Sequence, residues 1–122
     1  MSKKILVVDD SMTVRQQVGS VLQQSGFQVV EAGDGVEGAE AVAQHPDIAM
    51  VICDVNMPRM NGLDMVAKVK ADAKNAALPI IMLTTEGNPA LIQQAKAAGA
   101  KGWILKPFKA DQLLATVQKL TA

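Results

Sequence analysis

Side chains able to carry out chemistry stand directly after short apolar runs at four places in the sequence. Asp9 and Asp10 end one such run, and Asp54, Thr84 and Lys106 end others. If these runs are strands of one parallel sheet, the five side chains meet at the edge where the strands end. Three carboxylates placed together repel one another unless a cation is present. The residue types therefore predict a cation bound beside carboxylates.

Magnesium is the cation that suits this set of ligands. Proteins bind Mg²⁺ through one or two carboxylates and leave its other positions to water and phosphate oxygens. A lysine adds a compact positive charge, and a threonine adds a hydroxyl donor. A carboxylate that attacks phosphorus beside these cations forms an aspartyl phosphate, while the cations neutralise charge on the phosphoryl oxygens. Phosphoryl transfer to an aspartate is the chemistry that this combination indicates.

The apolar runs have the character of strands covered on both faces. Each run is continuously apolar, whereas a strand with one face in water alternates apolar and polar residues. The runs begin roughly 20–30 residues apart, which leaves room for a helical crossover between parallel strands. We expect five strands, at residues 5–8, 27–30, 49–53, 79–83 and 102–105.

Helical periodicity fills the intervals between these runs. The second helix is expected over residues 35–44, and apolar residues within 63–69 and 113–120 mark the third and fifth. Gly26 ends the first helix, while Asn88 and Pro89 start the fourth, which ends at Gly99. Five β-α units with right-handed crossovers form an α/β fold, a doubly wound five-stranded parallel sheet with five helices.

The composition excludes several classes of function. The 122 residues suit one domain, and 49% of them are hydrophobic, enough for a core without metal or disulfide. Twelve basic and twelve acidic residues balance, and aromatic residues are scarce, which argues against nucleic-acid binding. The single cysteine, Cys53, excludes an internal disulfide and fits a reducing compartment. No apolar run is long enough to span a membrane, so we expect no membrane insertion. We further expect a monomer in the cytoplasm.

Four segments resemble the receiver domains of two-component response regulators, most closely those of the stand-alone chemotaxis type. They are residues 5–10 (ILVVDD), 54–62 (DVNMPRMNG), 83–86 (LTTE) and 99–108 (GAKGWILKPF). The resemblance covers essentially the whole chain. It implies the flavodoxin-like (βα)5 receiver fold and a single receiver domain over residues 1–122 with no output domain. A phosphorylation signal would then be passed to a separate protein.

The resemblance assigns the acceptor and the metal ligands. Asp54 would accept a phosphoryl group from a sensor histidine kinase, and Asp10 and Asp54 would bind Mg²⁺ through their side chains. Asp9 would support the ion through water, and Asn56 would bind it through its backbone carbonyl. Activity would be limited to self-phosphorylation and autodephosphorylation of Asp54, so no conventional enzyme is implied.

The resemblance also assigns the groups that respond to the phosphoryl group. Lys106 would pair with the phosphorylated site, and its bond to the following proline would be cis. Thr84 would be the switch hydroxyl, and Trp103 the aromatic side chain that changes its packing. Glu86 and Asn56 would tune the lifetime of the phosphoaspartate.

The implied partners follow from the same resemblance. The switch would report to the surface formed by the fourth helix, the fifth strand and the fifth helix. This surface would bind a target protein such as a flagellar motor switch component, and a phosphatase is a further expected partner. Because Gln93, Gln94 and Lys96 lie among alanines in the fourth helix, the surface would dock a helix or peptide without being strongly apolar.

Two positions depart from the family pattern. The aromatic switch position more often carries Tyr or Phe, and the larger ring of Trp103 needs a partner for its N–H group if it is buried. Gly38 lies in the second helix where alanine is usual, at a cost of ~1 kcal/mol in helix propensity. We expect this helix to be weakened.

The same motifs are open to other interpretations. A phosphate sink or relay receiver shares every motif, and only target binding with and without a phosphoryl mimic separates it from a switch. A magnesium-dependent aspartyl phosphatase needs a second aspartate two residues after the nucleophile, where Ser11 and Asn56 stand instead. Residues 33–38 (GDGVEG) match a dinucleotide-binding fingerprint, but their acidic residues would face an anionic pyrophosphate. His45 and Cys53 are read as a solvated helix end and an inert core residue.

Overall fold

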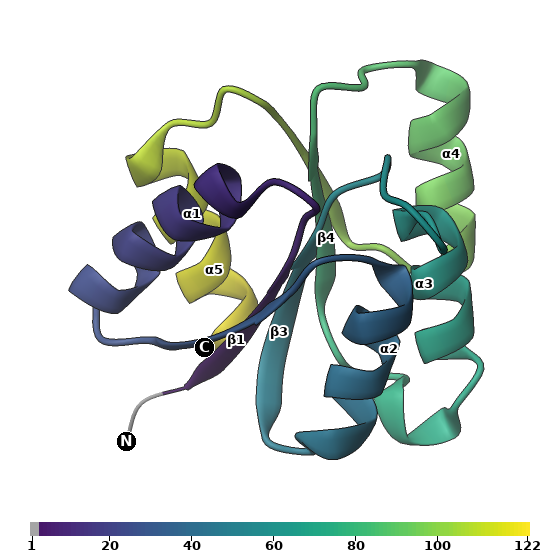
Figure 1. Cartoon of the computed structure of the whole chain (residues 1–122), viewed down its shortest axis with the longest axis horizontal. Helices are drawn as coiled ribbons and strands as arrows, with labels where there is room; N and C mark the ends of the chain where they lie inside the picture. The colour runs from purple at the N-terminus through teal and green to yellow at the C-terminus, as the bar shows by residue number, and fades with distance from the viewer. Residues whose placement is uncertain (1–2) are drawn as a thin grey trace.

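The computed structural model describes residues 3–122, which form one parallel sheet between two layers of helices (Figure 1). The strands are β1 (Lys4–Val8), β2 (Gln28–Ala32), β3 (Ile48–Cys53), β4 (Ile80–Thr84) and β5 (Gly102–Leu105). The helices are α1 (Met12–Gln24), α2 (Gly35–Gln44), α3 (Gly62–Lys70), α4 (Pro89–Ala98) and α5 (Ala110–Thr121), with a short 3-10 helix, η1 (Ala73–Asn75). The spatial order is β2-β1-β3-β4-β5. The predicted doubly wound α/β fold is confirmed.

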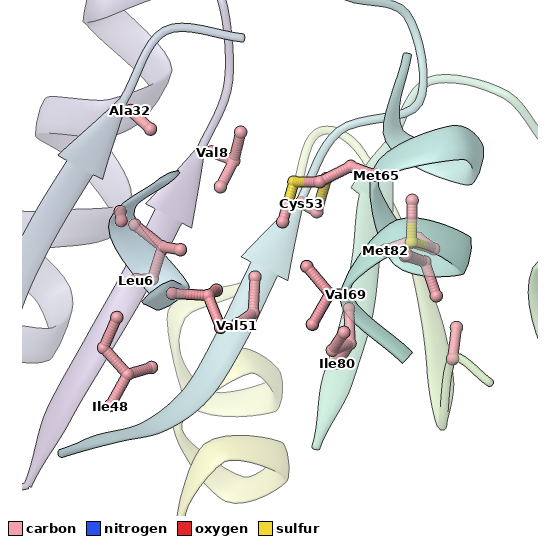
Figure 2. Packing of buried hydrophobic residues seen from close by; sticks show 14 of the residues in the cluster. Leu6, Val8, Ala32, Ile48, Val51, Cys53, Met65, Val69, Ile80 and Met82 are labelled. Atoms are coloured by element: carbon pink, nitrogen blue, oxygen red, sulfur yellow. The ribbon is translucent and has the colours of Figure 1, made fainter. Parts of the chain in front are cut away.

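The continuously apolar strands are explained by helices on both sides of the sheet. Helices α2, α3 and α4 cover one face, and α1 and α5 cover the other (Figure 1). Successive strand residues point to opposite faces. In β1, Leu6 and Val8 therefore join the core under α2–α4, whereas Ile5 and Val7 join the core under α1 and α5. Figure 2 shows the first of these cores, in which side chains of β1, β2, β3 and β4 pack with Met65 and Val69 of α3.

Polar caps fix where the helices begin. The side chains of Ser11, Asp34, Asn61 and Asn88 each accept a hydrogen bond from a backbone N–H in the first turn of the following helix. Such caps satisfy donors that have no partner inside the helix. The predicted start of α4 at Asn88 is confirmed, and Gly99 ends that helix with a φ of 116°.

The element boundaries differ from the prediction at two places that matter. Strand β2 extends to Ala32 and includes the charged Glu31, because an edge strand pairs with only one neighbour and leaves room for a polar side chain. Strand β4 includes Thr84, which pairs with Leu105 and is fully buried. The Thr84 hydroxyl, the predicted switch group, thus belongs to the sheet and not to the loop after it.

The glycine in α2 occupies a tight position, where a larger residue would displace its neighbours. A Cβ atom at Gly38 would lie 2.7 Å from Sδ of Met65 and 3.0 Å from a methyl carbon of Val8. The weakened helix predicted from Gly38 stays a prediction, but the structure adds a reason for this residue: it lets α2 approach β1 and α3 closely.

This packing makes a testable difference between two helical glycines. Gly19→Ala in α1 should raise the free energy of unfolding by up to ~1 kcal/mol, since its Cβ would meet only Val29 at an ordinary 3.6 Å. Gly38→Ala should instead lower it by about 1–2 kcal/mol, because overpacking outweighs the gain in propensity. Urea denaturation of the two variants measures both values. Equal stabilisation by the two substitutions would contradict the close contact with Met65.

Across residues 3–122, none of the helices combines the length and the apolar character needed to cross a lipid bilayer.

Candidate functional site

The three predicted carboxylates meet where the strand order reverses. Strand β1 lies between β2 and β3, so the chain winds in opposite directions from this point of the sheet. Asp9 and Asp10 follow β1 and Asp54 follows β3, and their carboxylate oxygens lie within 4.8 Å of one another. Ligands gather in the crevice at such a point of an open α/β sheet. The structure therefore brings together the aspartates that the sequence spacing singled out.

Lys106 supplies the positive charge beside these carboxylates. It follows β5, and its Nζ lies 2.7 Å from Oδ2 of Asp9 and 3.2 Å from Oδ2 of Asp54. The Lys106 side chain is 15% exposed, and those of its two partners are 3% and 10% exposed. Burial opposes the charged form of Lys106, but the hydrogen bond to Asp9 and the charges of both aspartates outweigh it and raise its pKa. The expected cis bond to Pro107 is confirmed.

The carboxylate of Asp54 is oriented by its own loop. Its Oδ1 accepts a hydrogen bond from the backbone N–H of Val55 at 2.7 Å, and its Oδ2 faces Lys106. The loop then turns back, and the N–H of Gly62 donates to the carbonyl of Val55 at 2.8 Å. A Cβ atom on Gly62 would overlap with the carbonyl oxygen of Asp54. Helix α3 therefore begins pressed against the backbone of Asp54, and only glycine fits there.

The two aspartates after β1 have different environments. Both carboxylate oxygens of Asp9 are occupied, one by the N–H of Ser11 at 2.9 Å and the other by Lys106. Asp10 is exposed, and within residues 3–122 its carboxylate has no hydrogen-bond partner. Asp10 is thus the carboxylate left free to bind an ion directly.

Arg15 of α1 supports this loop, and the sequence analysis did not identify it. Its Nη1 donates to the backbone carbonyl of Asp9 at 2.5 Å, and its Nε pairs with Glu31 of β2 at 3.0 Å. Nothing in the sequence marks Arg15 for this role, because its partner in β2 is distant along the chain.

The donor set fits a hard divalent cation. Three carboxylates and one lysine within contact distance leave two negative charges, which a divalent ion neutralises. All the candidate ligand atoms are oxygens, as Mg²⁺ prefers. The exposure of Asp10 leaves an open side through which an ion and a phosphate could enter.

A second group of hydrogen bonds joins the predicted switch residues through Glu86. The hydroxyl oxygen of Thr84 accepts from the N–H of Glu86 at 3.2 Å, and the carboxylate of Glu86 accepts from Nδ2 of Asn56 at 3.1 Å. The indole N–H of Trp103 donates to the backbone carbonyl of Glu86 at 2.8 Å. Trp103 is half-buried against the core under α2–α4. Its N–H group therefore has the partner that its burial requires.

The other motifs of the sequence have structural roles. Cys53 is fully buried, its Sγ lies 3.7 Å from Sδ of Met65 (Figure 2), and burial raises the pKa of its thiol. Such a thiol is inert. In the glycine-rich segment, Asp34 caps α2 by accepting from the N–H of Glu37 at 2.9 Å. The helix start expected there, in place of a dinucleotide fingerprint, matches this geometry.

Comparison with known proteins identifies the family. Residues 5–118 match the model of the response regulator receiver domain. The chain is 46% identical over 106 residues to the chemotaxis protein CheY1 of Helicobacter pylori, covering 86% of each chain. It is 45% identical over 106 residues to a chemotaxis protein CheY homolog of Campylobacter jejuni, covering 86% of this chain and 82% of the other.

Solved structures agree with this assignment. The structure of the chemotaxis protein CheY4 of Vibrio cholerae matches with a TM-score of 0.92 at 42% identity, over 98% of this chain and 99% of that one. CheY in a CheX-CheY-BeF3-Mg²⁺ complex of Borrelia burgdorferi matches with a TM-score of 0.91 at 29% identity, over 98% and 90%. The carboxylates at the reversal of strand order thus lie in a fold shared with a known group of signalling proteins. The chain belongs to the response regulator receiver domain family and is homologous to the CheY chemotaxis regulators.

Proposed function

We propose that this protein is a phosphorylation-controlled switch in which Asp54 accepts a phosphoryl group from a histidine kinase. The observation that carries the proposal is the placement of Asp54 beside two more carboxylates and Lys106 at the carboxyl ends of β1, β3 and β5. An oxygen of Asp54 attacks the phosphorus of phosphohistidine, a P–O bond forms, and the P–N bond breaks. The bonding electrons stay on the imidazole nitrogen, which takes up a proton.

The residues around Asp54 bind and orient the transferred group. Mg²⁺ would be held by the side chains of Asp10 and Asp54 and by the carbonyl of Asn56, and when bound it supplies neutralisation of charge on the phosphoryl oxygens. Asp9 would support the ion through water, and it pairs with Lys106 at 2.7 Å. Lys106 lies close enough to Asp54 to pair with a phosphoryl oxygen.

The bonds at Glu86 suggest how the signal leaves the site. In this structure the Thr84 oxygen accepts from the N–H of Glu86. A phosphoryl oxygen on Asp54 would attract the Thr84 hydroxyl as a donor and so perturb Glu86, which is also bonded to Trp103 and Asn56. The same contacts support a role for Asn56 and Glu86 in phosphate lifetime. Movement at Thr84 and Trp103 would alter the surface of α4, β5 and α5 and control binding of a target in trans.

The partners of this surface are part of the proposal. The homology to CheY chemotaxis regulators favours a target such as a flagellar motor switch component. The solved complex of a related CheY with CheX and beryllofluoride supports binding of a further protein, such as a phosphatase, to the phosphoryl-like state.

Acetyl phosphate with Mg²⁺ tests the acceptor. Intact-mass spectrometry should show one added phosphoryl group on the wild-type protein and none on Asp54→Asn, since an amide oxygen is a poor nucleophile. Thr84→Ala should still be phosphorylated, but beryllofluoride should no longer shift the amide resonances of residues 84–106. Phosphorylation of Asp54→Asn at the wild-type level would overturn the assignment of the acceptor.

A further inference from the structure

The loop between β3 and α3 carries Asp54 and Asn56, and its tip has a strained backbone. The N–H of Met60 donates to the carbonyl of Pro58 at 2.7 Å, which makes residues 58–60 a γ-turn. Arg59 at its centre has a φ of 62°, the left-handed region in which a residue with a side chain is unfavourable. Such a conformation persists only where surrounding contacts hold it.

The side chain of Arg59 makes the contacts that hold this turn. Its Nε and Nη2 donate to the two oxygens of the Asp34 carboxylate at 2.8 and 3.3 Å, and Nη2 lies 3.6 Å from Glu37. The Asp34 side chain is only 9% exposed and is already fixed as the cap of α2. The hydrogen bond from Arg59 is the main cause that lowers the pKa of Asp34. A two-point bond from arginine to a fixed carboxylate sets both the distance and the orientation of the loop.

A backbone hydrogen bond adds to the contacts between the loop and α2. We call these contacts, of Arg59 with Asp34 and of Met60 with Gly35, the clasp. The N–H of Gly35 donates to the carbonyl of Met60 at 3.1 Å, and a Cβ atom on Gly35 would overlap with that carbonyl oxygen. On its other side the loop is held by the bond from Asn56 to Glu86. The stretch from Asn56 to Met60 is thus held at both ends, by the loop after β4 and by α2.

We propose that Arg59 is a positioning residue: its clasp on Asp34 holds the β3–α3 loop so that Asp54 and the Asn56 carbonyl face the magnesium site. This inference rests on the proposed function, because it concerns the same metal site. Residues that orient metal ligands without touching the metal typically contribute 10–100-fold to affinity. The clasp predicts a loss at the lower end of that range, about tenfold, when Arg59 is removed.

The direction of the change in Mg²⁺ affinity distinguishes a positioning role of Arg59 from a purely electrostatic one. Arg59 is a cation on the same loop as Asp54, so its removal would strengthen Mg²⁺ binding if long-range electrostatics alone acted. The positioning role predicts weaker binding. Arg59→Gly is the sharpest variant, because glycine accepts a φ of 62° and relieves the strain of the turn while it removes the clasp.

Isothermal titration with MgCl₂ and hydrogen exchange of the metal-free protein test the inference together. Arg59→Gly should bind Mg²⁺ about tenfold more weakly, and the amides of residues 56–60 should exchange faster without metal. Asp34→Asn retains a capping side chain, and the double variant should bind no more weakly than Arg59→Gly alone. Lys4→Met, which removes the ion pair with the exposed Asp47, is the matched control and should leave both readouts unchanged.

Unchanged or tighter Mg²⁺ binding by Arg59→Gly would overturn the positioning role, as would additive losses in the double variant. Neither readout requires phosphorylation, so the two proposals fail separately. If wild type binds Mg²⁺ but takes no phosphoryl group from acetyl phosphate, the acceptor assignment fails while the clasp is still judged by its own measurements.

Discussion

Replacing Lys106 with methionine is expected to lower the free energy of unfolding by about 3 kcal/mol in the absence of Mg²⁺, because it leaves buried carboxylates without their cation. Lys106 lies 2.7 Å from Asp9, whose side chain is 3% exposed, and 3.2 Å from Asp54. Methionine has a similar volume and retains most of the packing of the lysine stem. The loss of stability therefore reports the removal of the positive charge and not the creation of a cavity. Urea denaturation at pH 7 with EDTA provides the value.

The choice of pH follows from the direction of the pKa shift. The pKa of Lys106 is raised in the folded state above its ordinary value of 10.5. The stabilisation that this shift represents is fully present below the unfolded pKa and disappears as the pH rises through the folded pKa. A measurement at pH 7 therefore captures all of it.

Magnesium provides the test of the cause. Saturating MgCl₂ should reduce the deficit of Lys106→Met, because the ion neutralises the same carboxylates. Lys4→Met is the control: its partner Asp47 is 64% exposed, and such surface pairs contribute less than about 1 kcal/mol. A deficit that is equal with and without Mg²⁺ would mean that Lys106 acts through packing alone.

The sequence was sufficient to locate the acidic site because parallel strands all end at one edge of a sheet. Asp9 and Asp54 are far apart in the chain, yet each directly follows a buried strand, and β1 and β3 are neighbours. Continuously apolar runs identified the strands and a period of 3.6 the helices, and the order of elements then determined which side chains share the edge. No information about tertiary contacts was needed for these residues.

The supporting residues could not be found in this way. Arg15 and Arg59 look like ordinary surface arginines, and their importance comes from partners, Glu31 and Asp34, that only the folded chain brings near. The sequence predicts that the indole N–H of Trp103 needs a hydrogen-bond acceptor if it is buried. It does not predict that the acceptor is the backbone carbonyl of Glu86, because this depends on the conformation of the loop after β4. Side-chain type predicts which groups can react, whereas their support depends on tertiary geometry.

Glycines show the same limit, since a sequence reveals their position but not the neighbour for which they make room. Gly33, Gly38 and Gly62 look alike as residues near helix starts or within helices. A Cβ on Gly33 would meet no atom closer than 3.7 Å, one on Gly38 would press against a flexible methionine, and one on Gly62 would overlap with backbone. The three positions should therefore tolerate alanine to very different degrees.

Gly62→Ala is expected to lower the free energy of unfolding by at least about 3 kcal/mol, more than ordinary overpacking, since the overlapped atom is a backbone oxygen that no rotamer change can move. That oxygen belongs to Asp54, the proposed acceptor, so relief of the clash must move Asp54 or the start of α3. Even where the variant folds, phosphorylation by acetyl phosphate should be slower. Denaturation and intact-mass kinetics measure the two effects, with Gly33→Ala as the control expected within about 0.5 kcal/mol of wild type. If Gly62→Ala were as stable and as reactive as the control, the tight junction between α3 and Asp54 would not be what holds the acceptor in place.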